Sequence, residues 1–319
     1  MGRKTDCHGE RMAEKVDLVW ENLNVGVEIP PSNVVVTPQL MKRYAYAVDD
    51  WDPESVPVRE SSIGQALLLG QAVLNAYRAK YRVDRVVSGL HARSEVEILN
   101  PPRLGERVTI TARHCDRYEK RGHRYRVLES EAIGKDSVVY LRARNHETLA
   151  ASVGAAKGVS GEETAAKVPT TVSDILVPCG YRTVPVGAQV TPLCKQVTFE
   201  QMIAFTGMAY DLSAGEKTYH TDIDFAKSFG LPTAIAQGQM SACYVSELMT
   251  RFFGWGWRRG GKMLVKFINA VFAGDTLYVS GAVREKVPEG GSTRIILDVW
   301  CENQAGKKVT VGEASGLIQ

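Results

Sequence analysis

The sequence predicts an α+β fold built from two tandem repeats, each with a long buried helix and a following antiparallel β-sheet. Residues 62–81 and 239–252 are apolar on nearly all sides, as in a helix that is enclosed by other elements. Alternating segments rich in β-branched and aromatic residues follow each of these stretches. Short motifs recur between the two halves at a nearly constant spacing, which indicates an internal duplication of roughly 150 residues.

The composition is that of an ordinary soluble globular protein with a substantial core. The chain has 319 residues, of which 44% are hydrophobic and 24% are charged, enough for one large domain or two medium ones. Its 39 Lys and Arg nearly balance 36 Asp and Glu, for a formal net charge of +3. The whole-protein charge therefore gives no reason to expect a nucleic-acid partner.

Cysteine spacing and hydropathy argue against a metal-binding, a secreted or a membrane-spanning protein. The six cysteines are scattered without a CxxC pair, which predicts free thiols in a reducing compartment and no metal site. No apolar run approaches the ~18 residues of a membrane span, and the first 15 residues contain no apolar core of a signal peptide. We expect a cytoplasmic protein without a membrane span.

The elements of the first half follow from local signals. Residues 16–23 are expected to form a short helix, and Thr37-Pro38 is an N-cap followed by Pro at the first helical position, with the helix ending near Asp49-Asp50. The apolar stretch 62–81 is expected to be a single buried helix. Four antiparallel strands are then expected at residues 88–99, 106–118, 124–133 and 136–148.

The second half repeats this order. Thr37 matches Thr198 and Asp50 matches Asp211 at an offset of 161, whereas Asn100 matches Asn269 at an offset of 169. The second copy therefore carries eight extra residues between the acid and the strands.

Gly64-Gln65 is paired with Gly238-Gln239. Strands are again expected at residues 264–271, 276–286, 293–302 and 308–318.

These matches divide the chain into three parts. Residues 16–150 form the N-terminal repeat, and residues 179–319 form the C-terminal repeat that carries the candidate active site. Residues 151–178 begin with a small, polar stretch without periodicity and are expected to be a linker.

The stretch 201–253 concentrates the residues with chemical potential. Asp211 and His220 lie on a loop that contains Gly and Ser, and Gly238 then opens the second apolar helix. An acid–base pair beside a helix N-terminus is what proton transfer next to a polarised carbonyl group requires. For each residue a structural role is the alternative: a loop histidine, a turn aspartate and a glycine at a helix start.

The predicted arrangement resembles the double hotdog fold over nearly the whole chain. The second half resembles the MaoC-like (R)-specific enoyl-CoA hydratase/dehydratase family in the segment HTDIDFAKSFGLPTAIAQGQMSACYVSELM, which begins at His220. The first half resembles the degenerate N-terminal hydratase domain of two-domain members in GLHARSEVEILNPPRLGERVT, residues 89–109. The family motif runs Asp, any residue, Asn, Pro, any residue, His. Here Asp211 and His220 are nine residues apart, Ser213 stands where Asn is expected, and the Pro is missing.

The resemblance implies a lyase that reversibly hydrates a trans-2-enoyl-CoA to an (R)-3-hydroxyacyl-CoA. The backbone N–H at Gly238 would stabilise the enolate-like oxygen, and His220 and Asp211 would hold a water molecule and move its protons, with their individual roles left open. No cofactor is implied beyond coenzyme A as part of the substrate, and an acyl carrier protein thioester is also open.

The candidate substrate-binding residues fall into three groups. Ser213, Gln237 and Gln239 accompany the proposed acid and the helix N-terminus. Tyr44 and Trp51 are candidates to line the acyl pocket from a catalytically silent first half, where His91 is expected to be structural. A basic cluster after the second apolar helix is a candidate for a CoA phosphate, with a solvated turn as the alternative: Arg258, Arg259 and Lys262.

Two other functional readings remain at this level. A hotdog thioesterase would share the fold, although Glu247 comes late in its helix and no acid lies in the first turns. A non-catalytic acyl-CoA-binding protein would result if the long 211–220 loop no longer assembled the pair. Two such repeats already form one dimer-like unit, so a monomer, a homodimer or a complex with a partner chain are all compatible with the sequence. Acyl length and type are not encoded in any recognisable pattern.

Overall fold

The computed structural model describes residues 15–57, 59, 61–82, 89–149, 175–176 and 184–318. Within these residues, eleven strands form one sheet in the order β2-β5-β6-β7-β4-β10-β13-β12-β11-β9-β8, and β1 and β3 form a separate pair. The strands are β1 Val16–Asp17, β2 Glu28–Val35, β3 Tyr81–Arg82, β4 His91–Ile98, β5 Arg107–Lys120, β6 His123–Ile133, β7 Val139–Leu149, β8 Ile175–Leu176, β9 Gln189–Gln196, β10 Gly261–Phe267, β11 Thr276–Glu289, β12 Ser292–Asn303 and β13 Lys308–Ile318. The α-helices are α1 Pro38–Val48, α2 Gly70–Leu74, α3 Phe199–Thr206, α4 Ile223–Ser228, α5 Gly238–Phe253 and α6 Trp255–Arg258.

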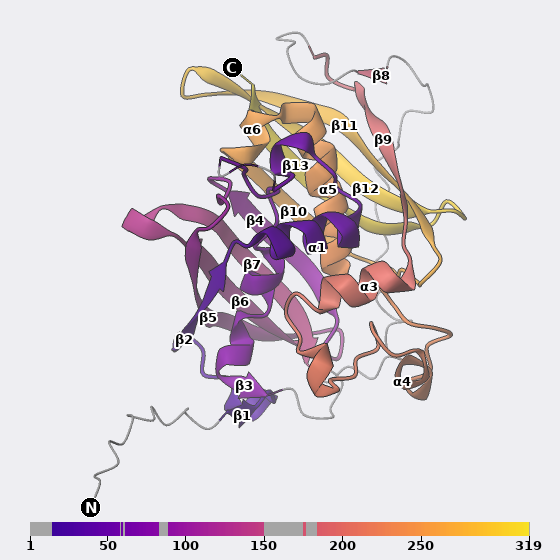
Figure 1. The fold of residues 1–319 in the computed structure, drawn as a ribbon. Helices are drawn as coiled ribbons and strands as arrows, with labels where there is room; N and C mark the ends of the chain where they lie inside the picture. Colours follow the sequence, from indigo (N-terminus) through magenta and orange to yellow (C-terminus); the bar gives the residue numbers. More distant parts are fainter. Residues whose placement is uncertain are drawn as a thin grey trace, which may run out of the picture.

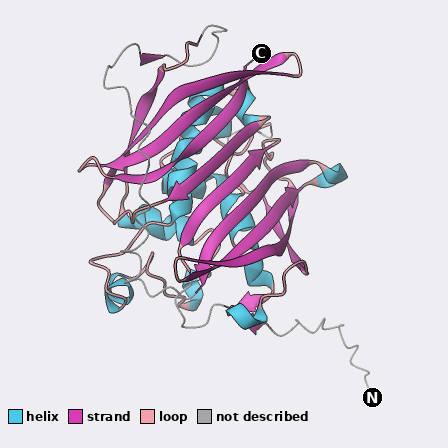
Figure 2. Ribbon diagram, turned by 180° about the vertical axis from the view of Figure 1, so that it is seen from behind, coloured by secondary structure: helices cyan, strands magenta, loops and turns pink. Residues whose placement is uncertain are grey.

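The sheet confirms the internal duplication. Strands β2, β4, β5, β6 and β7 of the first repeat are arranged in the same order as β9, β10, β11, β12 and β13 of the second. The two halves meet where β4 pairs antiparallel with β10, from Gly261 opposite Ile98 to Lys266 opposite Arg93. The helices cover one face of this continuous sheet, as the front and back views show (Figures 1 and 2).

The repeated motifs make equivalent hydrogen bonds in both halves. Thr37 caps α1 by accepting from the backbone N–H of Leu40, and Thr198 caps α3 through the N–H of Gln201. The side chain of Asn100 donates to the carbonyl of Val139, and that of Asn269 donates to the carbonyl of Lys308. Both offsets inferred from the sequence are therefore structural equivalences.

The expected single helix over residues 62–81 is wrong, although the segment is buried as predicted. It contains the short helix α2 and a 3₁₀ turn at Ala76–Ala79. Gly64 and Gly70 weaken the helix, and an ideal Cβ at Gly70 would lie only 2.7 Å from the Gln239 side chain of α5. The predicted pairing of Gly64-Gln65 with Gly238-Gln239 is two residues out of register. The bridge Ile63–Arg103 has its equivalent in Ile235–Phe272, and Gly64 and Ala236 donate equivalent backbone hydrogen bonds, so Gly64-Gln65 corresponds to Ala236-Gln237.

Two further expectations concern the margins of the repeats. The predicted helix at residues 16–23 is instead the short strand β1, parallel to β3, followed by a 3₁₀ turn at Trp20–Asn22. The predicted linker 151–178 lies outside the described residues except for β8, which pairs parallel with β9. The predicted boundaries of the linker stay a prediction.

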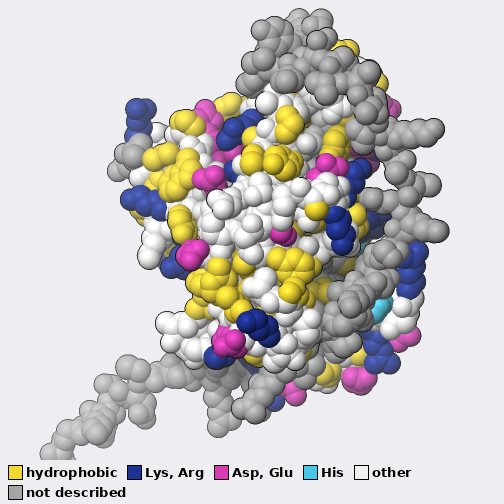
Figure 3. Space-filling view, turned by 90° about the vertical axis from the view of Figure 1, so that its right-hand side faces the viewer, with side chains coloured by type: hydrophobic (Ala, Val, Ile, Leu, Met, Phe, Trp, Pro, Cys, Tyr) yellow, Lys and Arg dark blue, Asp and Glu magenta, His cyan; other side chains and the backbone are white. Residues whose placement is uncertain are grey.

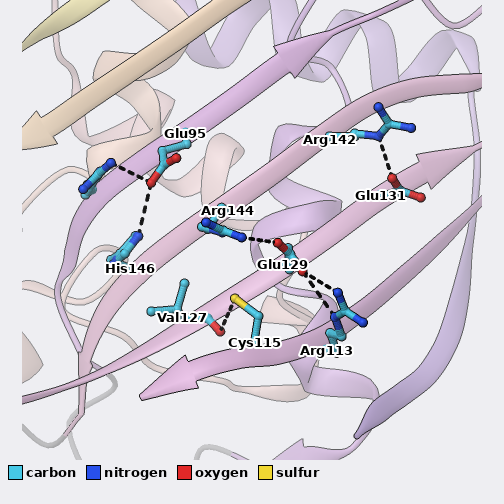
Figure 4. A network of polar contacts seen from close by, with 10 residues as sticks. Glu95, Arg113, Cys115, Val127, Glu129, Glu131, Arg142, Arg144 and His146 are labelled. Carbon is cyan, nitrogen blue, oxygen red and sulfur yellow. Dashed lines mark hydrogen bonds and ion pairs between the residues drawn. The ribbon is translucent and has the colours of Figure 1, made fainter. Parts of the chain in front are cut away.

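The outer face of the sheet is exposed to solvent and carries ion pairs between neighbouring strands. In the first repeat, Glu129 on β6 accepts from Arg113 on β5 at 2.9 Å and from Arg144 on β7 at 2.5 Å (Figure 4). Arg142 bonds Glu131 at 2.6 Å on the same face. Exposed pairs of this kind contribute little stability each, so the apolar inner face, covered by α5, α2 and α1, carries the core.

The described part of the chain also bears on the predictions about membrane spans and cysteines. No helix in it is both long and apolar enough to cross a membrane. Its four cysteines are free thiols, as predicted, and Cys243 is buried in α5 as a small apolar side chain.

Candidate active site

A cavity of about 140 Å³ lies where the two repeats meet, beside the N-terminus of α5. The first repeat contributes residues of α2 and of the facing ends of β4, β6 and β7, and the second contributes the 210–220 loop, the start of α5 and the end of β10. Its polar wall includes the side chains of Asn75, Tyr77, His91, His123, Glu147, Tyr210, His220, Gln237 and Ser241.

His220 reaches this cavity as the sequence predicted. Its backbone N–H donates to Thr218 Oγ1 at 3.1 Å, and its Nδ1 lies 2.6 Å from the carbonyl oxygen of Ile235. Because a carbonyl oxygen only accepts, Nδ1 must carry the proton and Nε2 keeps a lone pair. Nε2 makes no hydrogen bond to the residues that the structure describes. Burial lowers the pKa of His220 to about 4, so the ring is neutral at pH 7 and can act as a base.

The N-terminus of α5 faces the same cavity. Gln237 is the N-cap residue without a side-chain capping bond, and Gly238 is the first helical residue. Among the described residues, no acceptor engages the backbone N–H groups of Gly238 and Gln239. Unpaired N–H groups at a helix start, aided by the helix dipole, can stabilise an oxygen that gains negative charge.

A buried amide chain fixes the side chain of Gln237. Asn75 Nδ2 donates to Gln71 Oε1 at 2.7 Å, and Gln71 Nε2 donates to Gln237 Oε1 at 2.6 Å. Gln237 Nε2 then donates to Thr206 Oγ1 at 3.0 Å. Each amide therefore has a defined orientation, and the start of α5 is tied to α2 of the other repeat.

The first repeat contributes a charged pair to the cavity wall. Glu147 near the end of β7 is cross-strand neighbour of Arg126 on β6, and the two side chains form a buried ion pair. The guanidinium of Arg126 also stacks on Tyr77 at 4.0 Å from the ring centroid. Burial raises the pKa of Glu147, and Arg126 acts in the opposite direction.

His91 lies beside Glu147 in the cavity wall, because β4 pairs with β7 and places the two residues opposite each other. Its Nε2 lies 3.1 Å from Asn145 Oδ1, and burial lowers its pKa to about 3. The ring packs on Phe267 at a centroid distance of 4.6 Å. Phe267 in turn lies against Gly238, where an ideal Cβ would be 2.8 Å from the aromatic ring. His91 makes these structural contacts from within the cavity wall.

Asp211 and Ser213 lie outside the cavity wall. Asp211 is exposed and caps the 3₁₀ turn Leu212–Ala214, where its Oδ1 accepts from Ser213 Oγ at 2.5 Å and from the N–H of Ala214 at 3.2 Å. These hydrogen bonds hold the pKa of Asp211 below its ordinary value. Hydrogen bonds within the 211–220 loop thus engage the Asp211 carboxylate, which the sequence predicted to act together with His220. The neighbouring Tyr210 lines the cavity instead.

The predicted acyl-pocket residues are likewise placed elsewhere. Tyr44 is fully buried in the core, and Trp51 is 54% exposed, with its indole N–H donating to Asp49 Oδ1. Gln239 is buried against Gly70 rather than in the cavity wall. Of the residues named for binding near the helix N-terminus, Gln237 lines the cavity.

The three basic residues after α5 do not form one cluster. Arg258 is 1% exposed and ion-paired with Asp52, Arg259 stacks on Trp255, and Lys262 lies 3.5 Å from Glu97. They follow the far end of α5, whose 16 residues span about 24 Å from Gly238. On the face drawn in Figure 3, Lys and Arg side chains are scattered among acidic ones.

Around the acid position of the first repeat, the residues that the structure describes form no equivalent site. Asp50 is 6% exposed, and burial, together with Glu247, raises its pKa to about 7. Glu247 is held by Lys195 at 2.5 Å. These groups lie within the packed interior between the repeats.

Sequence reasoning expected the first repeat to line the pocket, but it named Tyr44 and Trp51 and missed Glu147 and its partner Arg126. One signal was available for Glu147: it falls in phase with Leu141 and Ala143 on the inward-facing side of β7, where a charge is unusual. Arg126 similarly interrupts the buried run on β6. Tyr210 and Phe267 offered no comparable signal.

Comparisons with known proteins agree with this architecture. Residues 186–295 match the family profile described as a MaoC like domain. The C-terminal repeat is a MaoC-like domain. No curated protein matches the chain.

Several solved structures share the arrangement of the MaoC-like domain and its preceding repeat. A MaoC-like dehydratase is 14% identical, with a TM-score of 0.70, covering 92% of this chain and 98% of that one. A MaoC domain protein of Chloroflexus aurantiacus is 11% identical, with a TM-score of 0.65, covering 95% and 97%. A Mycobacterium tuberculosis protein described as having a double hotdog fold is 13% identical, with a TM-score of 0.62, covering 94% and 97%. These likenesses confirm the double hotdog fold.

Proposed function

We propose that this protein is a hydro-lyase that adds water to a trans-2-enoyl thioester, or removes it from the (R)-3-hydroxyacyl thioester in the reverse direction. The observation that carries the proposal is the neutral His220. Its Nδ1 is fixed by the carbonyl of Ile235, and its Nε2 is left as a base in a cavity bounded by the start of α5. The MaoC-like domain profile and a structural neighbour named a MaoC-like dehydratase support the same reaction class.

In this proposal the thioester oxygen lies at the N–H groups that open α5. Those groups would stabilise the negative charge that develops on the oxygen when water attacks the β-carbon. His220 Nε2 would accept a proton from the attacking water, which a neutral imidazole with a low pKa can do across the physiological pH range.

The size of the cavity favours a compact acyl group. A cavity of similar volume, about 150 Å³, holds a molecule as large as benzene. We therefore propose short enoyl-CoA esters, beginning with the four-carbon trans-2-butenoyl-CoA, as the first substrates to test.

The thioesterase alternative, which requires a carboxylate from the helix, gains no support from α5. Glu247, the carboxylate of α5, is 2% exposed and bonded to Lys195 and Arg251, away from the residues that line the cavity. A carboxylate held in this way cannot approach a thioester carbonyl at the helix N-terminus.

The test follows loss of enoyl absorbance with trans-2-enoyl-CoA esters of increasing chain length, while free CoA is measured in the same sample. Hydration by the wild-type protein, lost in His220→Gln and unaccompanied by CoA release, is the expected result. His220→Gln keeps a side chain of similar size, and its melting temperature controls for folding. CoA release, or wild-type hydration that survives the substitution, would refute the proposal.

A further inference from the structure

The cavity contains one carboxylate among the described residues that line it, and it comes from the N-terminal repeat. That residue is Glu147, whereas Asp211 is absent from the cavity wall and is engaged as a turn cap. The acid expected from the sequence and the acid present at the cavity are therefore different residues on different repeats.

A short series of contacts joins His220 to the strand end that carries Glu147. The rings of His220 and Tyr219 are in edge contact with centroids 4.3 Å apart, and Tyr219 Oη donates to the carbonyl of Gly89 at 3.3 Å. The next residue, Leu90, donates through its N–H to Thr148 Oγ1 at 2.7 Å. Thr148 directly follows Glu147 in β7, so packing and backbone bonding set both functional groups against the same cavity.

Electrostatic neighbours support the same placement. Tyr210 lines the cavity, and its pKa is raised by burial first and further by the hydroxyl of Tyr77. Tyr219 and Glu147 also raise it, so Tyr210 lies within electrostatic reach of both the His220 side and the Glu147 side of the cavity.

The Arg126–Glu147 pair is poorly explained by stability alone. Removing two opposite charges from water costs several kcal/mol per ion, and apolar replacements of buried pairs are often neutral or stabilising. In this wall, however, Arg126 does more than neutralise Glu147. It is held by the ring of Tyr77 at 4.0 Å and by His114 Nε2 at 3.3 Å, so it fixes the orientation of the carboxylate and opposes the burial that raises the pKa of Glu147.

We propose that Glu147 is the catalytic carboxylate that works with His220, and that Asp211 has only a structural role in its loop. The inference rests on the proposed hydration reaction. It assigns to the N-terminal repeat a part in the chemistry itself, in addition to forming a wall of the cavity.

The proton balance requires one base and one fixed acceptor. The water would donate one hydrogen bond to the Glu147 carboxylate and the other to His220 Nε2. As the water oxygen bonds to the β-carbon, the carbon–carbon π electrons move toward the thioester oxygen, and the second water proton passes to Nε2. The resulting imidazolium returns this proton to the α-carbon, while the proton facing Glu147 stays on the new hydroxyl group. Both residues end in their starting protonation states.

The test compares the isosteric amide variants of the two candidate carboxylates on the substrate that the wild-type protein hydrates fastest. Glu147→Gln should lower kcat by about 10²-fold or more, because the amide no longer offers the charged acceptor that orients the attacking water. Asp211→Asn should keep more than about a third of wild-type kcat, because its side chain only caps a turn. Glu147→Gln should still bind the saturated acyl-CoA of the same chain length with a Kd within about threefold of wild type, which separates a chemical defect from a lost pocket.

Opposite results would overturn the inference without touching the proposed function. Wild-type turnover in Glu147→Gln, or a collapse of kcat in Asp211→Asn with an unchanged melting temperature, would return the catalytic role to the loop carboxylate. If Glu147→Gln does not fold, Glu147→Asp decides, because it keeps the charge that faces Arg126 but withdraws it by one methylene. A folded Glu147→Asp variant with wild-type kcat would refute the proposal, whereas a loss of at least tenfold would support it. Failure of the wild-type protein on every enoyl thioester would instead defeat the reaction assignment.

Discussion

Gly238 is where the structure makes its sharpest stability prediction, because two effects of a Gly238→Ala substitution oppose each other. Alanine is the better helix former, and Gly→Ala in a helix interior gains roughly 0.5–1 kcal/mol. Against this, the new Cβ would lie 2.8 Å and 2.9 Å from two ring carbons of Phe267, well inside the usual carbon–carbon contact of about 3.5–4.0 Å.

The contact with Phe267 should outweigh the helix preference. The ring would have to move by about 0.7 Å or more to restore an ordinary contact, and it is also packed against the ring of His91. Forcing an extra methyl group into a packed site costs about 1–3 kcal/mol. We therefore expect Gly238→Ala to reduce the free energy of unfolding by about 1 kcal/mol, within a range of about 0–2.5 kcal/mol after subtraction of the helix gain.

Urea unfolding of the single and double variants tests this reasoning. In a Phe267→Leu background the smaller side chain should relieve the clash, so that Gly238→Ala becomes neutral or stabilising and the double-mutant cycle shows coupling of about 1 kcal/mol or more. Gly281→Ala is the matched control, because an ideal Cβ there meets its nearest atoms at 3.5 Å. A Gly238→Ala protein that is more stable than wild type, or a cost that persists unchanged in the Phe267→Leu background, would refute the steric account.

Three further predictions concern protonation, a buried charge and a helix cap. Because burial lowers the pKa of His220 to about 4, kcat/KM should stay level between pH 8 and about 5, without a step near the ordinary histidine pKa of about 6.5. A decrease in kcat/KM centred near pH 6.5 would contradict the buried neutral base. The same lowered pKa contributes stability to the fold above pH ~6.5, and this contribution is lost as the pH falls toward 4. In that window the free energy of unfolding of His220→Gln, measured with urea, should therefore depend less on pH than that of the wild-type protein, by about 1.4 kcal/mol per pH unit. Lys195→Met leaves Glu247 buried and should lower the free energy of unfolding by about 3–5 kcal/mol. Arg251→Ala removes the 61% exposed partner of the same carboxylate and should lower it by less than about 1 kcal/mol. Equal losses would show that Lys195 is not the main partner of Glu247. Thr198→Ala removes the N-cap of α3 and should lower the free energy of unfolding by about 1 kcal/mol, and an unchanged urea midpoint would mean that the cap contributes nothing.

The sequence by itself determined the duplication and most of the strands, because these depend on local and periodic signals. Thr37 and Thr198 are N-caps in the structure, and the two asparagine motifs make the same backbone contacts in both repeats. Alternation of apolar and polar residues identified the strands because one face of the sheet is buried and the other carries ion pairs. The same reasoning placed His220 before the start of α5, as its short sequence separation from Gly238 allows.

Tertiary structure decided which other groups share the cavity with His220. Asp211 was the nearest acid in the sequence, but a carboxylate in a Ser- and Gly-containing turn finds its hydrogen bonds locally, and here it turns away from the cavity. Glu147 is 73 residues before His220 in the sequence, and only the pairing of β4 with β10 and the crossing of α2 and α5 bring their strands and loops together. The helix over residues 62–81 was overpredicted for a related reason: Gly70 allows close contact with Gln239 of the second repeat, and no local pattern contains that information.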